Sequence, residues 1–259
     1  MSDDLLLRRD GHIATITFNR EAKLNALTRE MWAELGQAVG ALSAEEELRC
    51  IVLRGAGTKS FSPGNDIAEF EDKRATVAQA RAYGRIMHRT LDALRRCPVP
   101  TVAMIHGICV GGGLEIAALC DVRICGEDSR FGAPINRLGL VMGYPEMEGL
   151  VRLVGPAKTL ELLLEGQIVD AAEALRLGLV SRVVPSGRVE AEALAAAARI
   201  AAGAPLVARW HKRFVARLAD PRPLTEAEQD EAFACFGTED FRTGYRAFLE
   251  KRTPEFEGR

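Results

Sequence analysis

Apolar positions in the first 55 residues change from the period of a strand to that of a helix and back. Residues 12–18 alternate between two faces, and Asp10-Gly11 separates them from a shorter apolar segment at 5–9, which predicts a β-hairpin. Thr28 precedes a segment whose apolar residues recur at helical spacing, so we expect it to cap a helix. Residues 50–54 are typical of a short buried strand.

Strand and helix patterns continue to alternate up to about residue 184. In chain order we expect a long polar loop over 58–66, a helix over 77–96 that ends before Pro98, a strand over 101–105, a glycine-rich turn over 107–113, an apolar helix over 114–120, a strand over 122–125 and a last strand over 179–184. From about Pro145 the other segments are almost all helical. This alternation predicts an α/β fold with largely parallel strands.

The pattern divides the chain into an α/β core over residues 1–199 and a helical region over 200–259. Thr225 and Glu228 form a capping box at the start of one helix in the second region. Five aromatic residues also gather there: Phe233, Phe236, Phe241, Tyr245 and Phe248. They fit either a small satellite core or packing against another subunit.

Charge and composition argue against several classes of protein. The 34 Lys and Arg residues nearly balance 36 Asp and Glu residues among the 259 positions, and they form no basic stripe, so we expect no nucleic-acid partner. Apolar runs end well before the ~18 residues that span a bilayer, so we expect no membrane partner. The first residues show neither a basic nor an apolar signal segment, which predicts a cytoplasmic protein.

The six cysteines and four histidines lack the spacings of metal ligands or of a disulfide framework. Most of the cysteines lie in apolar segments, where a free thiol behaves as a small hydrophobic side chain. We therefore expect free, buried cysteines and no metal.

Two glycine-containing segments could together bind a carbonyl oxygen. Gly64 lies in the polar loop, and it frees the backbone so that the N–H groups after it can point outward. Residues 111–113 are glycines that open a predicted helix, where N–H groups lack internal partners and carry the positive end of the helix dipole. Two such N–H groups that converge on one oxygen form an oxyanion hole, which stabilises an enolate or a tetrahedral oxyanion.

Glu115 is a single charged residue in the otherwise apolar segment 114–119. It lies three residues after Gly112, hence on the same face of the helix and close to the candidate hole. Burial there would raise its pKa toward the range that is useful for proton transfer. A paired structural carboxylate is the alternative interpretation.

Four motifs in order give the chain a resemblance to the crotonase superfamily, the enoyl-CoA hydratase/isomerase family. Residues 19–27 (NREAKLNAL) resemble the segment that contacts CoA, and residues 61–67 (FSPGNDI) resemble the first oxyanion loop. Residues 106–115 (HGICVGGGLE), with Cys120-Asp121, resemble the second loop, and residues 247–254 (AFLEKRTP) are similar to the family's usual ending. The resemblance covers essentially the whole chain.

The resemblance implies a crotonase-like spiral of β-β-α units with a C-terminal helical trimerisation region, assembled as homotrimers or homohexamers. It implies acyl-CoA thioesters as substrates, and no cofactor beyond the CoA that the substrate carries. The N–H groups of Asn65 and Gly112 would form the oxyanion hole, with Glu115 as the catalytic carboxylate. The substrate-binding positions would be Lys23, Leu24, Gly64, Asp66, Ile67 and Gly111.

One position departs from the family's hydratases, which place a second glutamate in a Phe-Gly-x-Pro-Glu sequence. Here Ile135 stands in place of that glutamate. Tyr144, Glu146 or Glu148 could supply a replacement polar group, although a surface or helix-start role is the other interpretation for each. We therefore predict enoyl-CoA hydratase chemistry, with an acyl-CoA decarboxylase, an isomerase or a non-catalytic acyl-CoA-binding protein as alternatives.

Overall fold

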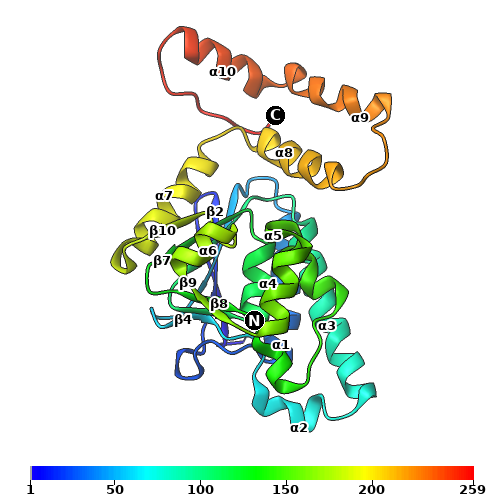
Figure 1. Cartoon of the computed structure of the whole chain (residues 1–259). Helices are drawn as coiled ribbons and strands as arrows, with labels where there is room; N and C mark the ends of the chain where they lie inside the picture. The colour runs from blue at the N-terminus through cyan, green and yellow to red at the C-terminus, as the bar shows by residue number, and fades with distance from the viewer. Residues whose placement is uncertain (1) are drawn as a thin grey trace.

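A computed structural model describes residues 2–259 and shows an α/β core with helices at one end (Figure 1). The main sheet has the strand order β1-β2-β3-β5-β7-β10. β1 and β2 pair antiparallel as a hairpin, and the other neighbours pair parallel. Its strands are β1 Leu5–Asp10, β2 Ile13–Phe18, β3 Cys50–Gly55, β5 Thr101–Ile105, β7 Val122–Gly126 and β10 Arg182–Val184.

A second sheet of four short strands lies beside the first and has the order β4-β6-β8-β9. β4, β6 and β8 pair parallel, and β8 pairs with β9 antiparallel. The strands are β4 Ser60–Ser62, β6 Ile108–Val110, β8 Arg130–Gly132 and β9 Ile168–Asp170. The chain alternates between the two sheets, since β3, β5 and β7 are each followed by a strand of the second sheet and then by a helix. This arrangement is the predicted spiral of β-β-α units.

Helices cover both faces of the main sheet. α1, α3 and α4 enclose the larger apolar core, and α7 packs its apolar face on β3, β5 and β7. The helices of the core are α1 Arg29–Ser43, α2 Phe70–Lys73, α3 Val77–Arg96, α4 Gly112–Leu119, α5 Tyr144–Glu165, α6 Ala171–Leu177 and α7 Val189–Ala201. α5 is broken at Gly155, which has a φ of 76°.

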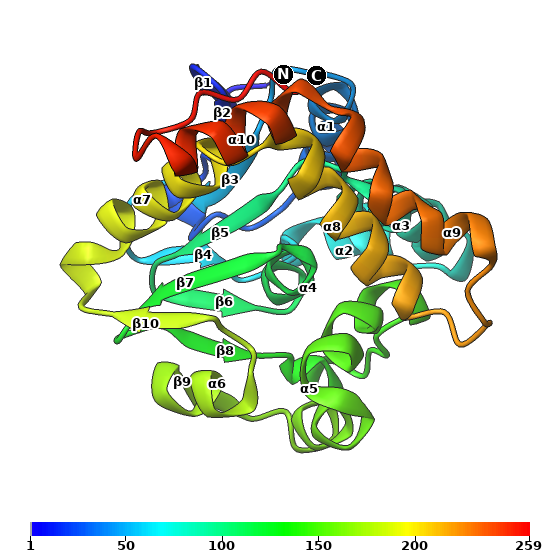
Figure 2. The same cartoon turned by 90° about the horizontal axis from the view of Figure 1, so that it is seen from above.

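The last helices, α8 Pro205–Leu218, α9 Glu226–Asp230 and α10 Glu239–Leu249, stand apart from the core in Figure 1, and Figure 2 looks onto them from above. Lys212 of α8 pairs with Asp121 of the core at 2.7 Å. The C-terminal tail returns along α10, where Asp240 accepts hydrogen bonds from the N–H groups of Glu257 and Gly258.

Most of the predicted elements are confirmed. Thr28 accepts a hydrogen bond from Met31 N–H as the cap of α1, and α3 has the predicted bounds. Thr225 forms the predicted capping box, and the six cysteines are free, five of them buried.

Four expectations about local structure were wrong. The loop over 58–66 and the glycine-rich turn over 107–113 each contain a short strand, β4 and β6. α4 begins at Gly112, two residues earlier than expected, because the glycines take part in its first turn. The last strand covers only residues 182–184 of the predicted 179–184.

Within residues 2–259, no single helix is long and apolar enough to cross a membrane. The bent pair of segments Ser186–Ala201 and Pro205–Leu218 reaches that length and composition together, with an angle of 102° between the two.

Candidate active site

A cavity of about 330 Å³ contains most of the residues that the sequence placed in the site. Its walls come from the loop after β4, the start of α4, the segment after β8 and the start of α5. The predicted site residues that line it are Lys23, Asn65, Asp66, Ile67, Gly111, Gly112 and Glu115. Two others do not line it. Leu24 is 38% exposed at the surface, and Gly64 packs against the backbone of Gly112.

Two backbone N–H groups of the cavity wall are available to a ligand. Leu27 N–H donates to Gly64 O at 2.8 Å, and Asp66 N–H donates to Leu27 O at 2.9 Å. Because this pairing uses the residues on either side of Asn65, the Asn65 N–H faces away from Leu27. Among residues 2–259, neither Asn65 N–H nor Gly112 N–H finds an acceptor. Gly112 is the first residue of α4, so its N–H also lies at the positive end of the helix.

Glycines bring these two N–H groups close together. A Cβ atom on Gly64 would lie 2.6 Å from Gly112 N, and Gly64 has a φ of 94° that other residues rarely adopt. A Cβ atom on Gly113 would lie 2.2 Å from Ser62 O. The loop after β4 and the start of α4 can therefore approach this closely only with glycine at both positions.

Trp32 holds the two N–H segments in place, a role that the sequence did not reveal. Its Nε1–H donates to Asn65 Oδ1 at 2.6 Å, and its side chain is fully buried. A Cβ atom on Gly112 would lie 2.9 Å from the Trp32 ring, so the indole also packs against the start of α4. In the sequence, Trp32 is one apolar position of α1 among several, and nothing local separates a core residue from one that orients a loop.

Glu115 lies in the first turn of α4 with its side chain in the cavity wall. Burial raises its pKa well above the ordinary 4.5, the negative charge of Glu146 raises it further, and Arg74 opposes both effects. Glu115 Oε2 is buried and has no hydrogen-bond partner among residues 2–259. The structure therefore gives this carboxyl group no structural partner, and it favours the proton-transfer interpretation.

Ile135 and the three candidates to replace the second glutamate differ in whether they line the cavity. Ile135 is half-buried, lines the cavity and packs against the core. Tyr144 is 89% exposed, and Glu148 pairs with Arg95 and Arg152 outside this cavity. Glu146 caps α5 as its sequence suggested, but it also lines the cavity.

Within residues 2–259, His, Cys, Asp and Glu side chains form no group of three that could hold a metal ion. The expectations that no metal and no separate cofactor take part stay predictions.

Comparisons with known proteins agree with this architecture. The model of the family described as enoyl-CoA hydratase/isomerase matches residues 8–259. A short-chain-enoyl-CoA hydratase of Clostridium acetobutylicum is 34% identical over 98% of this chain and 97% of its own length. A crotonyl-CoA hydratase of Syntrophomonas wolfei is 32% identical over 98% of each chain.

Among solved structures, an enoyl-CoA hydratase/carnithine racemase of Magnetospirillum magneticum superimposes with a TM-score of 0.97. It is 49% identical, and the match covers 100% of this chain and 97% of that one. Matches of this extent, in sequence and in fold, establish that the chain belongs to the enoyl-CoA hydratase/isomerase family.

Proposed function

We propose that this protein adds water to a 2-enoyl-CoA thioester. The observation that carries the proposal is the pair of unpaired N–H groups, Asn65 and Gly112, in the same cavity as the buried Glu115. A thioester oxygen bound by the two N–H groups would be stabilised as negative charge develops on it. Glu115 would then exchange protons with water and with Cα of the substrate.

The substrate's CoA portion would lie along Lys23–Leu24 and residues 65–67. Lys23 and Ile67 line the cavity, and Leu24 adopts a left-handed conformation with a φ of 53° at the end of a short 3₁₀ turn. Arg20 bonds Asp66 Oδ2 at 2.9 Å, which fixes the Asp66 side chain beside this path. Gly64 and Gly111 act by keeping side chains away from the N–H groups.

A decarboxylase is the second candidate, and Ile135 is the observation that favours it. An apolar side chain replaces the expected carboxylate in the cavity wall, and an apolar wall destabilises a substrate carboxylate that must leave as CO₂. Isomerisation of a 3-enoyl-CoA would use the same oxyanion hole.

Turnover of a panel of thioesters by the purified protein tests the proposal. We expect hydration of crotonyl-CoA, and Glu115→Gln should remove most of it while CoA binding is kept, because the amide is nearly isosteric but does not exchange protons. Turnover of malonyl-CoA or of a 3-enoyl-CoA in place of crotonyl-CoA would support the other enzymes. Acyl-CoA binding without turnover of any thioester would identify a non-catalytic binding protein.

We also propose that the protein assembles as a homotrimer or homohexamer through its C-terminal helices. The aromatic residues of this region form a chain of contacts, with ring centroids 4.7 Å apart for Phe236 and Phe241 and 5.4 Å apart for Phe241 and Tyr245. They do not form a closed satellite core, since Phe233 is 65% exposed and Phe248 is 82% exposed. Exposed apolar area of this kind is typical of a subunit contact. The cytoplasmic location expected from the sequence stays a prediction.

A further inference from the structure

Glu146 is a second carboxylate in the wall of the cavity that contains Glu115. It comes from the first turn of α5, while Glu115 comes from the first turn of α4. Its side chain is 15% exposed and contacts two polar groups. Glu146 Oε2 accepts a hydrogen bond from Gly143 N–H at 2.8 Å, and Oε1 lies 2.9 Å from His88 Nε2. These two contacts fix the Glu146 carboxyl group in the cavity wall.

The two carboxyl groups are close enough to influence each other. The charge of Glu146 is the second largest cause, after burial, of the raised pKa of Glu115. Two neighbouring carboxyl groups cannot both ionise easily, so the pair favours one protonated and one ionised member. Glu115 is buried, and its Oε2 has no hydrogen-bond partner among residues 2–259, so we assign the proton of the pair to Glu115.

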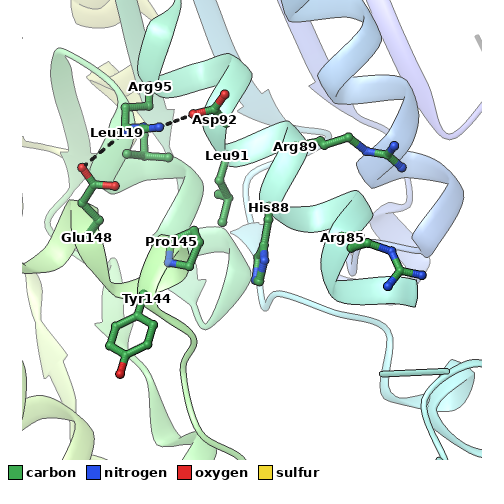
Figure 3. Close-up of a pocket in the computed structure, with 10 residues that line it drawn as sticks. All are labelled: Arg85, His88, Arg89, Leu91, Asp92, Arg95, Leu119, Tyr144, Pro145 and Glu148. Atoms are coloured by element: carbon green, nitrogen blue, oxygen red, sulfur yellow. Dashed lines mark hydrogen bonds and ion pairs between the residues drawn. The ribbon is translucent and has the colours of Figure 1, made fainter. Parts of the chain in front are cut away.

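His88 contacts Glu146 but does not line the cavity that contains Glu115. Its side chain is 38% exposed and lines a separate cavity of about 690 Å³ between α3 and the start of α5. Figure 3 shows His88 in this cavity near Pro145, and Glu148 bonded to Arg95. The other charged groups of this cavity are Arg85, Arg89, Asp92, Arg95 and Glu148, while Arg74 lies on the Glu115 side.

We infer that Glu146 is the base that activates the water and Glu115 is the acid that protonates Cα, with His88 positioning Glu146. The inference rests on the proposed hydration and names the group that replaces the glutamate missing at Ile135. It divides between two residues the roles that would otherwise fall to Glu115 alone.

The proton transfers balance over one turnover. Water gives a proton to Glu146, and its oxygen forms the bond to Cβ as the C=C π electrons move into the thioester enolate, held by the N–H groups of Asn65 and Gly112. The enolate then collapses and Cα takes the proton of Glu115. After the product leaves, Glu146 gives its new proton to water that enters the cavity, and Glu115 regains one from water.

Glu146→Gln is the first test. Glutamine can still accept the hydrogen bond from Gly143 N–H at the start of α5, so the fold should be kept. We expect the kcat for crotonyl-CoA hydration to fall by at least ~10²-fold with little change in KM, since one positioned base is lost. Glu148→Gln is the matched control, because Glu148 lies one half-turn further along α5 and outside the substrate cavity; its kcat should stay at the wild-type value.

A second measurement separates the two carboxylates. Exchange of the Cα protons of butyryl-CoA with D₂O needs an enolate and a group at Cα but adds no water. Glu146→Gln should therefore retain this exchange, and Glu115→Gln should lose both exchange and hydration. Loss of exchange in Glu146→Gln would overturn the division of roles.

The role of His88 has its own readout. His88→Ala should lower the kcat, and free imidazole should restore part of it, because the neighbouring cavity of about 690 Å³ has room for the ring. A merely structural histidine would not be replaced in this way, so failure of the rescue would overturn the part given to His88.

If the wild type hydrates crotonyl-CoA and Glu146→Gln does so at the same rate, the inference about Glu146 is wrong and the proposed function stands. If the wild type does not hydrate it, both fall.

Discussion

At the scale of single residues, the buried carboxyl group of Glu115 makes the stability of the protein depend on pH. Its folded-state pKa lies above the 4.5 of the unfolded chain, so the folded state keeps a proton that the unfolded state loses. The contribution is therefore fully present below about pH 4.5 and declines as the pH rises toward the raised pKa.

Glu115→Gln should remove this decline, because an amide has no proton to lose. The free energy of unfolding of the variant, relative to the wild type, should increase between about pH 5 and about pH 8 in urea titrations. Titrating groups that do not interact with Glu115 are common to both proteins and cancel in the difference. A difference that is constant over this range would contradict the raised pKa.

A glutamate in place of Ile135 should restore part of the activity that Glu146→Gln removes. In the double variant Ile135→Glu/Glu146→Gln, the new carboxylate faces the same cavity and should raise crotonyl-CoA hydration by ~10-fold or more over Glu146→Gln alone. Ile135→Gln in the same background is the control, because it adds a polar group without an acid. No gain from the glutamate would mean that position 135 does not reach the reacting atoms.

Some site residues could be predicted from the sequence because their signals are local. Glycines 111–113 and a single glutamate in an apolar helix stand within five residues of one another. Trp32 gave no such signal, and Glu146 was one of three candidates that the sequence could not separate. The Trp32–Asn65 bond joins residues 33 positions apart, and the Glu146–His88 contact joins residues 58 apart. Such roles depend on how elements pack, and a single sequence does not record packing.

At the scale of elements, the length of each helix or strand decided whether it could be predicted from the sequence. α3 has a capping threonine at one end and Pro98 just after the other, so its bounds follow from the sequence. β4, β6, β8 and β9 have three residues each, too few to show an alternating pattern. They exist because the spiral places them side by side, and each is paired with its neighbour in that sheet.

Gly64→Ala should damage the contact between the loop after β4 and the start of α4. The new methyl group would lie 2.6 Å from Gly112 N and would cover an N–H group that the proposed oxyanion hole needs. We expect the kcat for crotonyl-CoA to fall by ~10²-fold or more. Gly11→Ala is the control, because Gly11 also has a positive φ, of 53°, and nothing lies within 4 Å of the added methyl group. It should lose about 1 kcal/mol of stability and retain its activity; equal activity in the two variants would contradict the close approach.

At the scale of the whole molecule, the C-terminal helices leave apolar side chains without partners. They are bound to the core by polar contacts such as Lys212–Asp121, while the aromatic side chains of α10 face outward. The resulting surface is the part of the molecule where a second copy would bury the most apolar area.

Light scattering should therefore give a mass of three or six times 28.2 kDa. Phe248→Asp should shift the protein toward monomers without loss of helical circular dichroism, because the side chain is 82% exposed in the single chain. Val77→Asp, at a position 70% exposed at the start of α3, should leave the mass unchanged. A monomeric mass for the wild type at micromolar concentration would contradict the proposed assembly.

In the mechanism that we propose, the spiral also separates substrate binding from the choice of reaction. Asn65, Gly112 and Ile135 each lie two or three residues after a strand of the short sheet, so three successive turns each supply one wall of the cavity. The first two turns contribute backbone groups, which mutation of side chains scarcely alters. The third contributes a side chain, which a single substitution can exchange. An ancestor with this architecture could therefore change its reaction by a substitution in the third turn, with Glu146 of the following helix as the new base. The backbone groups that bind the thioester would stay unchanged.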